Sequence, residues 1–162
     1  MRSVSTIVRL AYSVAVVIGF ESTASAGATW AISPCVAGVK SSSPSEFEIT
    51  YEWSVSSTPT ADRWVYVHFT DSKGVIKFKD EFEPDPAMTK WKQGQEKVKL
   101  ASRKVQIPKE LSGPFEIRMG TFNKANGARD AIFGSSDGEL RIKVGQIKTD
   151  GGKVVFEELK ST

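Results

Sequence analysis

A run of strictly alternating apolar and polar residues, from Glu46 to Val55, limits what this chain can fold into. The apolar set is Phe47, Ile49, Tyr51, Trp53 and Val55, and the polar set is Glu46, Glu48, Thr50, Glu52 and Ser54. Successive side chains of a β-strand point to opposite faces of the sheet, so this spacing predicts a strand with one buried and one solvated face. We therefore expect a sheet that is covered on that side.

The strand pattern continues along most of the chain. Residues 63–70 are apolar on both faces, which is typical of a central strand, and residues 71–74 hold the Asp and Gly of a tight turn before a returning strand at 75–82. Further extended segments are expected over residues 95–107 (interrupted by a bulge near Ser102), 114–122, 139–147 and 153–159. About seven or eight strands and no helix predict an all-β fold, an antiparallel β-sandwich, with a barrel as the lesser option.

The N-terminal 26 residues have the pattern of a secretory signal peptide. Two arginines open the segment, residues 10–20 form an apolar run, and residues 24–26 (Ala-Ser-Ala) supply the small side chains that signal peptidase accepts before Gly27. The apolar run is too short for a spanning helix, which needs about 20 residues. We therefore expect a secreted or periplasmic protein with one domain over residues 27–162 that does not span the membrane.

The net charge and the cysteine content limit the classes of partner that this chain is expected to bind. The formal net charge is +3 at pH 7, and subtracting the two arginines and one glutamate of the signal segment leaves +2. This weak balance, with no basic run interleaved with aromatic residues, does not predict nucleic-acid binding. Cys35 is the single cysteine, so it cannot form an internal disulfide. A small buried thiol is the favoured interpretation, and a thiol available to a partner is the alternative.

Catalytic and metal-binding patterns are sparse. His68 is the only histidine and no Gly-x-Ser-x-Gly motif frames a nucleophile, so we predict no enzyme. On a central strand, His68 is expected to be a neutral imidazole hydrogen-bonded inside the fold. Calcium is the better metal candidate because it takes oxygen ligands, which crowd one strand end: Asp80, Glu81, Glu83 and Asp85. No calcium motif orders these carboxylates, so a solvated run is favoured and no metal site is assigned.

Tryptophan positions suggest where a ligand would lie. Trp53 and Trp64 have strand parity consistent with burial and are predicted to be structural, like His68. Trp91 lies among polar residues in a loop, either as a platform for a sugar ring or as a plug across the end of the sandwich, with the plug favoured. If a ligand binds, its candidate residues are Trp91, Asp80, Glu83, Asp85 and Arg129, provided that the loops cluster at one rim.

The middle of the chain contains an ordered series of short motifs. They are Trp64-Val65-Tyr66-Val67-His68-Phe69-Thr70-Asp71, Gly74, Lys79-Asp80-Glu81, Pro84, Trp91-Lys92-Gln93-Gly94-Gln95, Ile107-Pro108 and Gly113-Pro114-Phe115-Glu116-Ile117-Arg118-Met119-Gly120-Thr121-Phe122. The series resembles an accessory β-sandwich of bacterial extracytoplasmic proteins, often attached to glycosyltransferase-like membrane proteins or glycan-handling enzymes. The resemblance covers roughly residues 46–147 and implies an immunoglobulin-like sandwich in a glycan context, with no catalytic residue to transfer.

Two departures from that family's pattern bear on a site. Phe82 stands where the family usually has a second histidine, and Phe115 and Phe122 replace tyrosines. If His68, Asp80 and the second histidine form a polar or metal-binding cluster in relatives, the loss of one imidazole weakens that cluster here.

Together these patterns predict an exported, non-catalytic binding or accessory module that binds a polysaccharide or an envelope partner. The alternative is a structural or protein-interaction domain of the cell envelope, which would use an unpaired sheet edge or Cys35.

Overall fold

The computed structural model describes residues 27–134 and 136–159, so the predicted signal peptide lies outside the described residues. The strands are β1 (Thr29–Trp30), β2 (Ile32–Ser43), β3 (Glu46–Val55), β4 (Trp64–Thr70), β5 (Ile76–Phe82), β6 (Gln95–Lys99), β7 (Arg103–Gln106), β8 (Phe115–Phe122), β9 (Ala131–Ile132), β10 (Ile142–Asp150) and β11 (Lys153–Glu158). One 3-10 turn, η1 (Met88–Lys90), interrupts the loop before β6. No helix in this part of the chain is long and apolar enough to cross a membrane.

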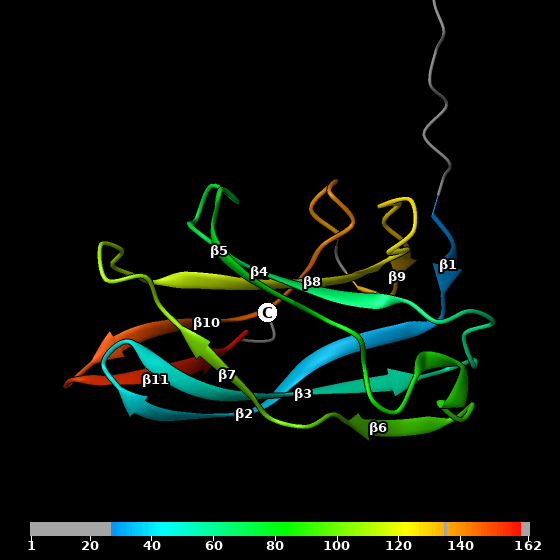
Figure 1. Cartoon of the computed structure of the whole chain (residues 1–162), viewed down its shortest axis with the longest axis horizontal. Coiled ribbons are helices and arrows are strands. Elements are labelled where there is room, and N and C mark those ends of the chain that lie inside the picture. The colour runs from blue at the N-terminus through cyan, green and yellow to red at the C-terminus, as the bar shows by residue number, and fades with distance from the viewer. Residues whose placement is uncertain (1–26, 135, 160–162) are drawn as a thin grey trace, which may run out of the picture.

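Two antiparallel sheets lie face to face (Figure 1). One has five strands in the order β11-β10-β8-β4-β5, and the other has the order β2-β3-β6, with β7 also paired to β3. A short parallel pair, β1 with β9, lies beside them. The prediction of an all-β, antiparallel, sandwich-like fold is therefore confirmed.

The core lies between the two sheets. Phe47, Ile49, Tyr51 and Trp53 of β3 have no exposed surface, as the alternation predicted, and the inward side chains of β4 meet them. The ring centroids of Phe47 and Phe69 are 6.0 Å apart in an edge-to-face arrangement. Burial of such side chains is the main favourable contribution to folding, about 1.5–3 kcal/mol for each large apolar group.

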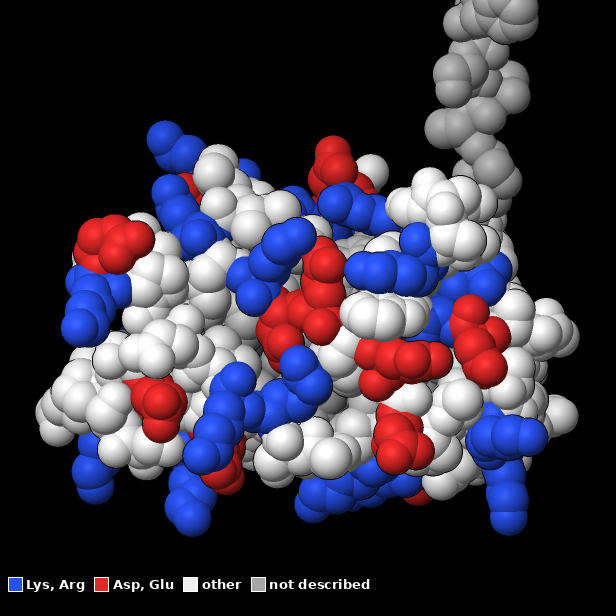
Figure 2. Space-filling view, viewed as in Figure 1, with Lys and Arg blue, Asp and Glu red and all other residues white. Residues whose placement is uncertain are grey.

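Polar contacts join the sheets along both long edges. On one edge, the Val154 amide of β11 donates to Ser41 Oγ of β2 over 2.9 Å. On the other, Arg103 of β7 forms two hydrogen bonds to Asp80 of β5, one of them 2.7 Å long. Figure 2 shows this second edge, where acidic side chains gather near the middle with basic side chains around them.

Two local expectations differ from the structure. Residues 95–107 form two strands, β6 and β7, instead of one bulged strand, because both pair with β3 on either side of a break. The Leu100 amide donates to Tyr51 O within that break, which keeps the backbone satisfied. Cys35 is exposed on β2, contrary to the favoured buried thiol, because its neighbours Pro34 and Val36 take the inward positions of the strand.

Candidate binding site

The outer face of β4, directed away from the other sheet, is also buried over its middle residues. Tyr66 and His68 on this outer face are only 2% and 4% exposed. The described parts of the loops between β8 and β10, within residues 123–134 and 136–141, lie over this side of the sheet in Figure 1. This cover is made largely of polar and charged residues, whereas the inner face is covered by apolar side chains.

Gly120 of β8 allows Tyr66 to lie close against the sheet. The two residues are directly opposite in the register, and a Cβ at Gly120 would be only 2.2 Å from Tyr66 Oη. The hydroxyl donates to Leu140 O over 2.7 Å, and the Arg129 guanidinium carbon lies 5.1 Å from the ring centroid. Burial raises the pKa of Tyr66 to about 12, so the phenol is a neutral hydrogen-bond donor.

His68 lies beside Tyr66, with 4.8 Å between the ring centroids. Burial, followed by the nearby cations Arg129 and Arg141, lowers its pKa to about 4, so the imidazole is neutral near pH 7. Its Nδ1 atom is buried and has no hydrogen-bond partner among the described residues. The internal hydrogen bond that the sequence predicted for this imidazole is therefore missing at Nδ1.

A hollow of about 200 Å³ opens above these rings, and we call it the outer hollow. It is lined by Tyr66, His68, Glu81, Phe122, Gly127 and Arg129. Glu81 accepts a hydrogen bond from Lys79 Nζ over 2.9 Å, which lowers the pKa of this carboxyl below its usual value. Arg129 Nη1 donates to Glu139 O over 3.0 Å. The outer hollow therefore combines aromatic rings, an unpartnered nitrogen, one carboxylate and one guanidinium.

An ion-pair network fixes the loop that borders the outer hollow. Asp137 accepts from Arg118 and Arg141, each over 2.8 Å, and Arg141 also reaches Gly74 O. Arg118 in addition pairs with Glu116 on the same strand. Because these charges belong to β8 and to the loop that leads into β10, they hold Leu140 where Tyr66 can bond to it.

Trp91 is a plug and not a platform. Its side chain is 1% exposed, its ring lies 5.6 Å from that of the fully buried Trp53, and its Nε1 donates to Pro86 O over 2.9 Å. No ring face is therefore left for a sugar. Trp64, by contrast, is only half-buried and lies on the outer face, where Lys124 Nζ is 4.2 Å from its ring centroid.

The predicted ligand residues do not meet at one rim. Asp80 is opposite the buried Val67 in the register and so faces the interior side of the sheet, where Arg103 binds it. Arg129 lies on the other side, against Tyr66. Glu83 and Asp85 line a separate hollow of about 150 Å³ beside Arg103 at the sandwich edge. The same parity separates His68 from Asp80, so the conditional cluster of these two residues does not form either.

The carboxylates considered for calcium are likewise divided. Asp80 and Glu81 are consecutive on β5 and point to opposite faces, and Asp80 is already bound by Arg103. Among the described residues, no group of three or more His, Cys, Asp or Glu side chains is placed to hold a metal ion.

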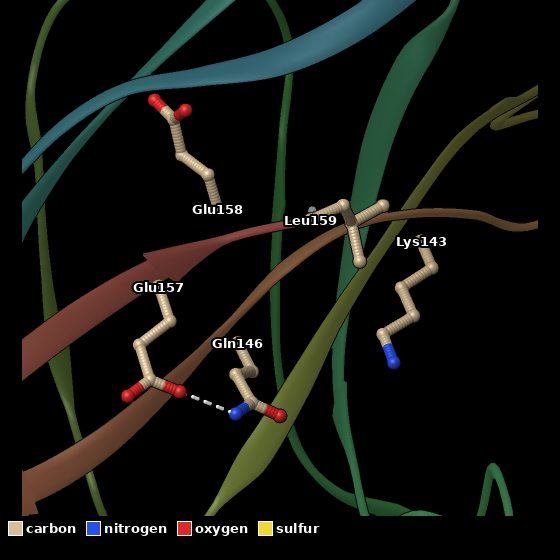
Figure 3. A pocket seen from close by; sticks show the side chains of 5 residues that line it. All are labelled: Lys143, Gln146, Glu157, Glu158 and Leu159. Carbon is tan, nitrogen blue, oxygen red and sulfur yellow. Dashed lines mark hydrogen bonds between the residues drawn. The ribbon is translucent and has the colours of Figure 1, made fainter. Parts of the chain in front are cut away.

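A larger, open hollow of about 590 Å³ lies at β10 and β11 (Figure 3). It is lined by Lys143, Gln146, Glu157, Glu158 and Leu159. Several of its polar groups are already bound: Gln146 donates to Glu157, and Lys143 donates to Glu116 over 2.6 Å. It therefore lacks the buried, unpartnered polar atom that distinguishes the outer hollow.

Sequence reasoning missed the combination of Tyr66, Glu81, Phe122 and Gly127. The available signal was strand parity, which places alternate residues of β4, β5 and β8 on one face. Comparison with known proteins found no matching family, no matching curated protein and no matching solved structure. The function is therefore argued from the outer hollow itself.

Proposed function

We propose that this chain is an exported, non-catalytic binding module with an immunoglobulin-like sandwich, and that its ligand is a carbohydrate bound at the outer hollow. The observation that carries the proposal is that His68, whose buried Nδ1 has no partner among the described residues, lines a hollow that is also lined by the Phe122 ring. The signal-peptide pattern of the N-terminal segment supports export.

The chemistry of the outer hollow suits a sugar. A buried polar atom without a partner costs about 1–3 kcal/mol, so a ligand that supplies the missing bond gains that much. A hydroxyl can donate or accept, and so it fits either tautomer of a neutral imidazole. The C–H face of a sugar ring packs on an aromatic ring, and Glu81 and Arg129 offer an acceptor and a donor to the remaining hydroxyls.

A binding role is favoured over glycoside cleavage. Most glycosidases use two carboxyl groups about 5–9.5 Å apart, one of them protonated to act as the acid. Among the described residues lining the outer hollow, Glu81 is the single carboxylate, and its bond from Lys79 keeps it ionised. With a pKa of about 4, His68 is a weak base at neutral pH.

The test is capture on a glycan array and on insoluble polysaccharides, using the exported and processed protein. Phe122→Ala removes the ring from the outer hollow, and Phe133→Ala is the matched control because Phe133 is exposed and does not line it. We expect capture of a defined glycan that Phe122→Ala abolishes and Phe133→Ala preserves. A protein that melts cooperatively but captures no glycan would overturn the proposal.

Exposure of Cys35 favours a second candidate, a protein-interaction domain. The thiol lines a hollow of about 460 Å³ together with Phe156 and Leu159, and burial raises its pKa. Non-reducing electrophoresis of the purified protein tests this alternative. A disulfide-linked dimer that Cys35→Ser abolishes would support it, and a monomer under oxidising conditions would argue against it.

A further inference from the structure

We propose that the ligand of the outer hollow is anionic: an acidic glycan whose carboxylate is bound by Arg129, with Lys124 beside it. This inference rests on the proposed carbohydrate-binding function and adds the class of sugar. It is carried by the unused hydrogen-bonding groups of the two cations and by the balance of charge around the hollow.

The Arg129 guanidinium has hydrogen-bond donors that no described residue uses. Its Nη1 atom binds Glu139 O over 3.0 Å and Glu139 Oε2 over 3.2 Å. No described residue accepts a hydrogen bond from its Nε or Nη2 atom, and the side chain is 34% exposed. A guanidinium with a free edge is suited to bidentate recognition of a carboxylate, which is stronger and more directional than binding to a neutral hydroxyl.

Lys124 supplies a second cation beside the Phe122 ring. Its Nζ atom lies 4.2 Å from the Trp64 ring centroid and 5.8 Å from that of Phe122, which lines the outer hollow. It forms no ion pair with any residue in the described part of the chain. The aromatic rings therefore hold an ammonium group near the hollow without neutralising it.

Cations outnumber carboxylates at the outer hollow. Arg129 lines the hollow and Lys124 lies over its Phe122 ring, whereas Glu81 is the one carboxylate among the described lining residues and is already paired with Lys79. The nearby carboxylates Asp130 and Asp137 are bound by other arginines. Burial lowers the pKa of His68 most, and among the charged neighbours Arg129, Arg141 and Lys79 lower it further while Glu81 raises it. The excess positive charge favours an anion within about 8–10 Å, the distance over which salt does not screen it.

The remaining polar groups of the outer hollow would then bind the hydroxyl groups of the sugar. His68 and Glu81 both line the hollow, so the imidazole, whose Nδ1 has no partner among the described residues, and the Glu81 carboxylate would each bind a hydroxyl. Glu81 would also repel a carboxylate placed on its side of the hollow. The acidic group is therefore expected on the Arg129 side, which fixes the orientation of the ligand.

The experiment compares binding of uronic-acid oligosaccharides with their carboxyl-reduced, neutral counterparts, using the processed protein. We expect at least tenfold weaker binding of the reduced form, equivalent to about 1.4 kcal/mol, and weaker binding of the acidic form at high salt. Arg129→Gln is expected to remove this preference and Lys124→Gln to reduce it. Lys153→Gln, which removes the same charge from the exposed first residue of β11, should leave it unchanged.

The outcomes separate the two proposals. Equal binding of the acidic and reduced oligosaccharides would overturn the anionic ligand and leave carbohydrate binding intact. Binding of neither class of glycan by a folded protein would overturn both. The comparison of the two oligosaccharides on the unmodified protein needs no variant, so it stays informative even if Arg129→Gln disturbs Tyr66 and fails to fold.

Discussion

Both faces of β4 are buried over its middle residues, but they are covered by different chemistry. On the inner face, Val65, Val67 and Phe69 have no exposed surface and pack against the opposite sheet. On the outer face, Tyr66 and His68 are almost as buried, yet their cover is a loop that brings guanidinium and carboxylate groups. One strand therefore separates an apolar core from a polar enclosure.

The difference indicates which face stabilises the fold and which face is available for recognition. The inner-face side chains Val65, Val67 and Phe69 carry no polar atoms, so they need close packing and not hydrogen-bond partners. Buried polar groups normally form hydrogen bonds, and on the outer face His68 Nδ1 has no partner among the described residues. We therefore expect the largest losses of stability from substitutions on the inner face, and effects on ligand binding only from substitutions on the outer face.

The largest effect is expected from Phe69→Ala on the inner face. Phe69 packs edge-to-face on Phe47 and stacks on Phe78 with 4.4 Å between ring centroids. Removing the ring should lower the free energy of unfolding by about 3–5 kcal/mol, because it leaves a cavity that rigid sheets cannot close. Denaturant unfolding measures the change. A loss below about 1 kcal/mol would mean that the inner face is loosely packed. The two faces of β4 would then not differ in their contribution to stability.

Gly120→Ala on the outer face should have the next largest effect. The added Cβ would lie 2.2 Å from Tyr66 Oη and 2.9 Å from Leu140 O, so the ring must leave its hydrogen bond. We expect a loss of about 1–3 kcal/mol, typical of an overpacked site. Gly38→Ala is the matched control, since nothing lies within 4 Å of its Cβ position. Equal unfolding curves for the two variants would show that Tyr66 is not held against Gly120.

A pH-dependent effect of about 2 kcal/mol should follow from His68. Its folded pKa of about 4 lies below the ordinary 6.5, so the unfolded chain takes up a proton first as the pH falls. The stabilisation is therefore complete above pH 6.5 and is lost toward pH 4, with about 2 kcal/mol lost between pH 7 and pH 5. The groups facing the imidazole are Arg129, Arg141, Lys79 and Glu81.

His68→Gln provides the control for this titration. The variant should show a flat stability over pH 7 to 5, measured by urea unfolding at each pH. Carboxyl groups with lowered pKa, such as Glu81 beside Lys79, contribute above their ordinary value of 4.5 and lose that contribution only at lower pH. A parent protein as flat as the variant would show that His68 is solvated, and the polar enclosure would then be open.

The two faces were not equally predictable from sequence. The inner face follows from period-two alternation, which gives β3 its bounds, Glu46–Val55, without reference to the rest of the chain. The same rule failed at residues 95–107 and gave no assignment to β2, which begins near Pro34 and is interrupted by shifts of register. The apolar pattern of residues 63–70 also predicts burial on both faces of that strand. It does not predict which residues cover the outer face.

The outer hollow depends on loops, and so the sequence could not assemble it. Arg129 was named as a ligand residue, yet its expected companions lie at the opposite side of the sheet or in the core. Trp91 lies in a polar stretch of sequence and is nevertheless buried, because Trp53 and the Pro86 carbonyl receive it. Local polarity predicts exposure only where no distant element provides a partner, and that information is absent from short motifs.

The smallest effect on stability is expected from Arg129→Gln, although the same change should abolish recognition of an acidic ligand. The Arg129–Glu139 pair spans 3.2 Å, and its side chains are 34% and 65% exposed, so solvent screens most of the attraction. Its removal, together with the loss of the contact over Tyr66, should cost no more than about 1 kcal/mol.

Arg103→Gln is the matched comparison, because Arg103 forms two hydrogen bonds to the more buried Asp80. Loss of charge-assisted bonds to a largely buried carboxylate should cost more, about 1.5–3 kcal/mol, without affecting the outer hollow. Urea unfolding and oligosaccharide binding, measured on both variants, would then give opposite rankings. If Arg129→Gln proved the more destabilising of the two, the cations of the outer face would serve the fold, and the division between a stabilising inner face and a binding outer face would fail.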